Sequence, residues 1–232
     1  MRLGVSVPTV LAGSLLLGGL GLAGGCAENR SSLYIESVMY IDPSGSDCVA
    51  DPSGDTPFLS TGFLDLAVRE SYIAPIIIGN QLYPVGNGAR LRTETSRIQI
   101  ESADVIVEPI SGSGGGSYRV PFSAIVHPGD DDPGKTGVFV ELVPRGVIGD
   151  VGQYMLSVTL NGRTLGGTPI QSGEWHFPLT ACEGCLLRCP SDPEAEIEWH
   201  PCAFLNGADY PLDCRAYLAW NPRACDACPE PE

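Results

Sequence analysis

Residues 150–164 of the chain read DVGQYMLSVTLNGRT. The segment from Tyr154 to Leu160 alternates between larger apolar side chains and smaller or polar ones, as expected for a strand with one buried face. Asn161-Gly162 follows directly, and this pair favours the tight turn of a β-hairpin because both residues tolerate positive φ. The stretch therefore predicts a strand over 154–160 that ends in a hairpin at 161–162.

Further segments of similar character precede and follow this strand. Clusters of Gly, Pro, Asp and Ser separate them, and many short strands with regular turn signals are typical of an all-β sandwich. Ile76-Ile77-Ile78 is apolar throughout, which predicts a strand covered on both faces. The other predicted strands are Leu33–Ile41, Phe63–Glu70, Tyr72–Ile78, Arg97–Glu101, Val105–Glu108, Tyr118–Val126, Val138–Val143 and Trp175–Ala181.

Asp150, Gly152 and Tyr154 have the D-x-G-x-Y form of a tyrosine corner. This motif resembles the start of strand F in immunoglobulin-like sandwiches, where the Tyr hydroxyl bonds back to the preceding chain. Leu156 stands where antibody domains have a Cys, so the resemblance is to immunoglobulin-like sandwiches in general. It covers residues 33–181 and implies an all-β, Ig-like antiparallel β-sandwich with a small disulfide-rich C-terminal appendage.

The first 26 residues, MRLGVSVPTVLAGSLLLGGLGLAGGC, combine a charge at Arg2, an apolar middle and a small-residue end. This order is that of a secretory signal. The end at Cys26 resembles the lipobox of bacterial lipoproteins, although Ala23 stands where that family usually has Leu. The resemblance implies a signal peptide over 1–25, lipid attachment at Cys26 and a short tether over 26–32. A plain signal peptide and an uncleaved membrane helix are the alternatives.

The anchor and the sandwich together resemble bacterial envelope lipoproteins that display an Ig-like domain. The resemblance implies an exported chain held to the membrane by its lipid, acting as a binding or structural module with an envelope protein or glycan as partner. Ala27 follows Cys26, where lipoproteins retained in the inner membrane have Asp, so the resemblance implies the outer membrane. The net charge of −15 argues against nucleic-acid binding. We expect no enzymatic activity and no cofactor.

The chain has nine cysteines, and setting Cys26 aside leaves an even number, as expected of an exported protein with a disulfide framework. Most lie in the segment 182–232, which is short of core-forming residues and rich in acids and prolines. The eight disulfide candidates are Cys48, Cys182, Cys185, Cys189, Cys202, Cys214, Cys225 and Cys228. A first strand parallel to the last one would end at the same pole, so Cys48 is expected to pair with Cys182 or Cys185.

Two CxxC pairs, Cys182–Cys185 and Cys225–Cys228, leave alternatives open. Thiolates at this spacing can hold zinc, but a zinc ribbon separates its pairs by only about 15–20 residues. A thioredoxin-like redox role would need a βαβ context, which the strand pattern lacks. Structural disulfides are therefore the favoured interpretation, no metal site is expected, and an exported redox or metal-binding protein is the alternative function.

Other polar clusters in the sequence do not have the spacing of a known site. The acidic loops offer hard oxygens for calcium but do not have EF-hand spacing, so solvated loops are favoured. No nucleophile elbow is present, and the histidines are dispersed, so no catalytic residue is assigned. A short helix is expected from Pro211 to Trp220. These acidic, serine and histidine residues are Asp42, Asp47, Asp51, Asp55, Asp130, Asp131, Asp132, Ser113, Ser117, His127, His176 and His200.

Overall fold

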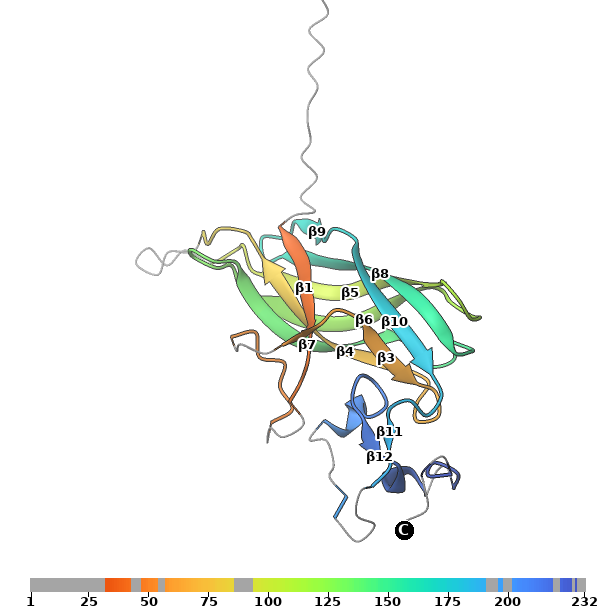
Figure 1. Ribbon diagram of the computed structural model, residues 1–232. Coiled ribbons are helices and arrows are strands. Elements are labelled where there is room, and N and C mark those ends of the chain that lie inside the picture. Colours follow the sequence, from red (N-terminus) through yellow and green to blue (C-terminus); the bar gives the residue numbers. More distant parts are fainter. Residues whose placement is uncertain are drawn as a thin grey trace, which may run out of the picture.

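The structure, a computed structural model, describes residues 32–42, 47–53, 57–85, 94–190, 196–197, 202–218, 222–226 and 228. Two β-sheets pack face to face, and a small C-terminal appendage lies at one end of them (Figure 1). Cys26 and the signal segment lie outside the described residues, as do Asp55, His200 and Trp220. None of the helices among the described residues is long and apolar enough to cross a membrane.

Sheet A, as we name it, has four strands, and each neighbouring pair in it is antiparallel. Its order is β2 (Phe58–Leu59), β1 (Leu33–Met39), β4 (Tyr72–Asn80) and β7 (Gly134–Val143).

Sheet B is larger, and only its first pair of strands is parallel. Its order is β3 (Gly62–Asp65), β10 (Trp175–Cys182), β8 (Gly152–Thr164), β5 (Ile98–Pro109) and β6 (Gly116–Val126), with β9 (Pro169–Gln171) against β8.

The connectivity is that of an immunoglobulin-like sandwich. Sheet A takes β1, β4 and β7, and sheet B takes β5, β8 and β10, which are the places of strands A, B, E and C, F, G. The predicted fold class, an Ig-like antiparallel β-sandwich with a disulfide-rich appendage, is confirmed.

Alternation along the strands builds the core between the sheets. In β8, the side chains of Tyr154, Leu156, Val158 and Leu160 are fully buried, as the sequence pattern predicts. Strand β4 is buried on both faces: Ile76 and Ile78 belong to the main core, whereas Ile77 packs in a second cluster with residues of the appendage. The appendage therefore covers the outer face of sheet A at one end.

The predicted hairpin at Asn161-Gly162 is wrong. Strand β8 continues to Thr164, and the chain turns back after it to form β9. Gly162 lies opposite Ile100, next to the bulge of β5, where a Cβ would come within 2.4 Å of the Gln99 carbonyl oxygen. The glycine therefore allows close approach of two strands rather than a turn.

The appendage contains little regular structure. Strand β11 (Leu187–Arg188) pairs in parallel with β12 (Leu212–Asp213), and the helical elements among the described residues of the appendage are the 3₁₀ turns η2 (Ala203–Leu205) and η3 (Cys214–Tyr217). The helix predicted from Pro211 is thus reduced to η3. Leu212 belongs to β12 and so cannot start the helix. The Asp213 side chain caps η3 by accepting a hydrogen bond from the backbone N–H of Arg215.

Candidate functional site

The sandwich has two poles, and the chain uses them differently. Strand β4 begins at Tyr72 and ends at Asn80, where it pairs with Leu33, the first residue of β1. The Tyr72 end contacts the appendage through Asp209. The described chain therefore enters at one pole and carries its cystine-rich segment at the other (Figure 1). We call these the entry pole and the cystine pole.

A disulfide between Cys48 and Cys202 joins the loop after β1 to the appendage. The predicted pairing of Cys48 with Cys182 or Cys185 is wrong. It assumed that the first strand runs beside the last, but β1 lies in sheet A, and the strand parallel to β10 is β3. Cys48 is consequently on the sheet A side of the pole, where the second cluster, including Cys202, is buried.

Aromatic and arginine contacts strengthen the same joint. Tyr210 stacks on Tyr40 with ring centroids 5.1 Å apart, and its hydroxyl accepts a hydrogen bond from the backbone N–H of Ile41. Phe204 meets Phe139 edge to face at 4.9 Å. Arg69, half-buried beside them, donates to the Phe204 carbonyl oxygen. The appendage is thus packed on the sandwich and not merely tethered to it.

Asp209 inserts from the appendage into the pole. Its Oδ1 accepts from the backbone N–H of Phe63 at 2.6 Å, and its Oδ2 accepts from the Tyr72 hydroxyl at 2.7 Å. Burial raises the pKa of Asp209 to about 6, and the two hydrogen bonds oppose this rise. The same burial, with the neighbouring carboxylate, raises the pKa of Tyr72 well above its ordinary value. Asp209 has φ of 64°, a left-handed conformation that Asp tolerates better than most residues.

Asp65 is fully buried at the end of β3, beside Cys182 at the end of β10. Its Oδ1 accepts from the backbone N–H of Gly184 at 2.7 Å, and its Oδ2 accepts from that of Leu186 at 2.8 Å. Cys182 and Cys185 form a disulfide across this loop. One carboxylate therefore holds the whole Cys182–Leu186 loop against sheet B.

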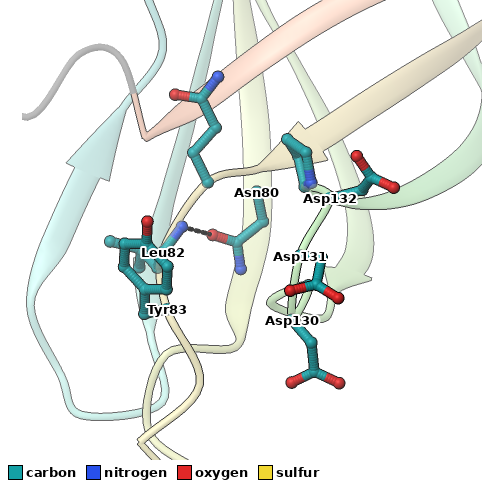
Figure 2. A pocket seen from close by; sticks show the side chains of 9 residues that line it. Asn80, Leu82, Tyr83, Asp130, Asp131 and Asp132 are labelled. Carbon is teal, nitrogen blue, oxygen red and sulfur yellow. Dashed lines mark hydrogen bonds between the residues drawn. The ribbon is translucent and has the colours of Figure 1, made fainter.

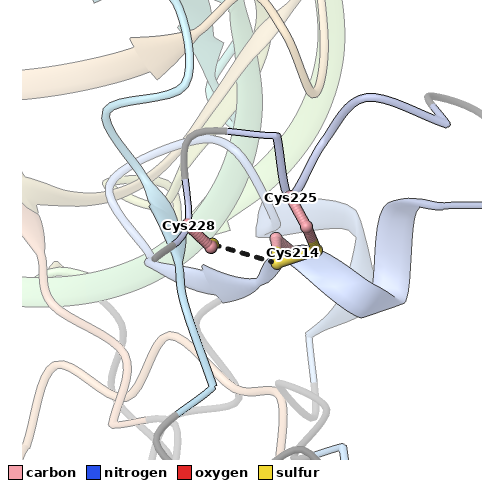
Figure 3. Close-up of side chains that lie close together, drawn as sticks. All are labelled: Cys214, Cys225 and Cys228. Carbon is pink, nitrogen blue, oxygen red and sulfur yellow. Dashed lines mark hydrogen bonds between the residues drawn. A yellow bond between two sulfur atoms is a disulfide. The ribbon is translucent and has the colours of Figure 1, made fainter. Parts of the chain in front are cut away.

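The remaining cysteines pair as Cys189–Cys228 and Cys214–Cys225, so the second CxxC motif is not closed on itself. The Sγ atoms of Cys214 and Cys228 lie 3.6 Å apart, and Figure 3 shows the two sulfurs facing each other. All eight disulfide candidates are thus paired in the structure.

Among the described residues, two groups of potential metal ligands have donor atoms within 4.8 Å of one another. Both contain cysteines whose sulfurs are bonded to other sulfurs, and a zinc ligand would have to be a free thiolate. The groups are Cys214, Cys225 and Cys228, and Asp65, Cys182 and Cys185.

At the entry pole, Asp130, Asp131 and Asp132 line an open hollow of about 350 Å³ together with the exposed Tyr83. Figure 2 shows the three carboxylates spread along the loop instead of converging on one point. Asn80 is buried beside them, but its side chain already bonds Ser96, Val126 and Leu82. The described residues that line the hollow therefore form no prepared cation site.

The structure also brings together residues that the sequence leaves apart. His176 lies opposite Ser157 on the outer face of sheet B, with Nδ1 and Oγ 2.9 Å apart, and its Nε2 is 3.4 Å from a Glu174 carboxylate oxygen. Ser113 instead serves the tyrosine corner, because its carbonyl oxygen lies 2.8 Å from the Tyr154 hydroxyl. The contact between Ser157 and His176 follows from the register of β8 against β10, which the sequence pattern does not give.

The Tyr154 hydroxyl is also 2.8 Å from the carbonyl oxygen of Asp150. It shares its proton between two stretches of backbone, the turn before β8 and the loop between β5 and β6. Gly152 lies in close contact with that loop, because a Cβ there would be 2.1 Å from the Ser111 carbonyl oxygen. The three residues of the D-x-G-x-Y motif thus hold the turn before β8 against the loop between β5 and β6, at one end of sheet B.

Comparison with known proteins adds little. No protein-family model matches the chain, and no curated protein does. A search of solved structures returns the ASH / PapD-like domain of human CEP192 (PapD-like domain 7), with a TM-score of 0.32 and 10% sequence identity, covering 78% of this chain and 96% of that one. The fold assignment rests on the sheet topology and on the Tyr154 corner described above.

Proposed function

We propose that the protein is a lipid-anchored module of the cell envelope that presents its cystine pole to a partner. The observation that carries this proposal is the separation of the two poles. The first strand begins at the entry pole, and the appendage is fixed at the other end of the sandwich. An anchor before Leu33 therefore leaves the cystine pole facing away from the membrane.

The N-terminal sequence supports the anchor. Cys26 ends a secretory-type signal, and acylation there, with two or more chains, is sufficient for stable membrane attachment. Residues 27–32 reach about 20 Å when fully extended. The entry pole would therefore lie close to the bilayer.

The dimensions of the sandwich then set the height of the cystine pole. Strand β4 runs from pole to pole in nine residues, and about 3.3 Å per residue makes it about 30 Å long. Because two joints fix the appendage to sheet A and to β3, its height and orientation are defined. A rigid display at a fixed height suits binding or structural bridging.

The pole offers a surface for such contacts. Phe204 and Phe63 are 43% and 40% exposed there, and aromatic side chains supply much of the energy of protein interfaces. An envelope protein or a glycan can stack on such rings, whereas the net charge of −15 disfavours nucleic acid.

Membrane fractionation of cells that produce the full chain tests the anchor. The natural protein should sediment with the membranes in high salt and be released by detergent. The Cys26→Ser variant should be recovered in the soluble exported fraction. Release of both proteins by salt alone would contradict the proposal.

A further inference from the structure

One disulfide differs from the other three. Cys182–Cys185 links residues only three apart, whereas Cys48–Cys202 spans 154 residues. In the chain-entropy account, a disulfide stabilises a fold more as the loop that it closes becomes longer. Cys182–Cys185 therefore restrains the unfolded chain least, and its position needs another explanation.

Its exposure points to reactivity. Cys185 is exposed, as is Cys189 in the longer-range Cys189–Cys228 disulfide, whereas Cys202 and Cys214 are completely buried in theirs. Cys182 is half-buried at the end of β10, and its Sγ lies 3.6 Å from the Leu64 carbonyl oxygen. A thiol from outside can thus approach one sulfur of the pair more readily than the other. Exposed disulfides of this kind are the ones that exchange.

The loop is also held in place independently of its disulfide. Asp65 binds the backbone N–H groups of Gly184 and Leu186, and a third one, that of Ala67, anchors the carboxylate at 3.0 Å. When the S–S bond opens, these hydrogen bonds keep the two sulfurs opposite each other. A thiol at Cys182 would then be well placed to attack a mixed disulfide at Cys185.

We propose that Cys182–Cys185 is a thiol–disulfide exchange site for dithiols of other exported proteins. A partner thiolate attacks the Sγ of Cys185 and forms a mixed disulfide. The Cys182–Cys185 bond breaks, and Cys182 leaves as a thiolate that takes a proton from water. The second partner thiol gives its proton to water and attacks the partner's own sulfur in the mixed disulfide. The bond to Cys185 breaks, and Cys185 leaves as a thiolate that takes a proton from water. The partner dithiol is oxidised to a disulfide by two electrons, and Cys182 and Cys185 are reduced to two thiols.

The charges around the loop define the class of partner. Glu183 lies between the two cysteines, and Asp65 lies beneath them within 4.8 Å of the sulfurs. With a net charge of −15 on the chain, a cationic thiol should approach more readily than an anionic one. The proposed partner is therefore a dithiol on a neutral or basic surface. This inference concerns the exported domain and does not depend on the lipid anchor.

The first test uses the purified, oxidised full chain and two small probe thiols, cysteamine and 2-mercaptoethanesulfonate. Samples are quenched with iodoacetamide, and peptide mapping measures how fast each disulfide opens. Cys182–Cys185 should open at least tenfold faster than the other three while the near-UV circular dichroism is unchanged. Cysteamine should act several-fold faster than the sulfonate at low salt, and this ratio should shrink at high salt. Uniform opening, or opening of Cys182–Cys185 last, would overturn the proposal.

Single variants separate the roles of the two sulfurs. In Cys182→Ser, the exposed Cys185 should capture cystamine in a stable mixed disulfide. In Cys185→Ser, the half-buried Cys182 should react at least tenfold more slowly. Asp65→Asn tests positioning: its amide cannot accept from both N–H groups, so the equilibrium fraction of mixed disulfide should rise several-fold while Cys48–Cys202 remains closed. Equal reactivity of the two thiols would rule out the assigned direction of attack.

Discussion

The hydroxyl of Tyr72 lies 2.7 Å from the Oδ2 of Asp209, and this contact joins the core of the sandwich to its appendage. The two residues are 137 positions apart in the chain. Tyr72 is fully buried and Asp209 is half-buried, so the carboxylate has exchanged part of its water for one hydroxyl and one backbone N–H. The appendage is therefore held by a group whose charge the fold disfavours.

The contact between Tyr72 and Asp209 predicts that the free energy of unfolding depends on pH. The pKa of Asp209 is raised from 3.8 to about 6, so the folded state binds this proton more tightly than the unfolded state does. Protonated Asp209 therefore adds to the free energy of unfolding. This contribution is fully present below pH 3.8, falls as the pH rises to about 6, and is absent above that. The shift corresponds to about 3 kcal/mol.

Asp209→Asn should remove this dependence, because Asn is neutral, tolerates positive φ and can still accept from Phe63. Urea unfolding should show the variant more stable than the natural protein at pH 7, by about 1–3 kcal/mol, and nearly equal at pH 4. A variant that is less stable at pH 7 would mean that the charged carboxylate is favoured in the fold.

The tyrosine corner gives a second prediction. Tyr154→Phe removes a hydroxyl that serves the carbonyl groups of Asp150 and Ser113, and the ring is fully buried. The free energy of unfolding should fall by about 1–3 kcal/mol, measured by urea denaturation. Tyr83→Phe is the matched control, because Tyr83 is 80% exposed, and it should have no measurable effect. Equal effects in the two variants would show that the corner contributes nothing.

The close contact at Gly162 gives a third prediction. Gly162→Ala places a Cβ against the Gln99 carbonyl oxygen, so β5 and β8 must separate. We expect a loss of about 1–3 kcal/mol in thermal or urea unfolding. Gly149→Ala is the control, since the nearest atom to its Cβ would be 3.5 Å away. An Ala variant at 162 as stable as this control would contradict the observed register.

The disulfides should differ in what they contribute to stability. Replacing both Cys48 and Cys202 by Ser removes a link across 154 residues and should lower the free energy of unfolding by about 3–5 kcal/mol. The double Ser variant of Cys182 and Cys185 should lose only about 2 kcal/mol or less, because its loop is short. If the second variant lost more than the first, the short disulfide would be a structural staple.

The local part of this fold can be predicted from the sequence. Strand alternation identifies the buried face of β8, and the D-x-G-x-Y motif points to the hydrogen bond of Tyr154 with Asp150, because donor and acceptor are four residues apart. The apolar run at Ile76–Ile78 correctly predicts a strand covered on both faces.

The non-local part cannot be predicted in this way. Asn161-Gly162 favours a turn by itself, and only the close approach of β5 explains why the strand continues through it. The partner of Cys48 depends on β3, a short strand that lies beside β10 where β1 was expected. The contact between Ser157 and His176, and the insertion of Asp209, likewise depend on which strands are neighbours.

The intact mass of the protein extracted from membranes without reductant, with alkylation before and after reduction, tests the central claim most directly. We predict a chain that begins at Cys26 and carries acyl mass. Apart from the exchangeable pair Cys182 and Cys185, it should take up no alkyl groups until it is reduced, and eight in total afterwards. A mass without lipid, a chain that begins elsewhere, or thiols of the other six cysteines that react before reduction would contradict the account of a lipid-anchored, cross-linked envelope module.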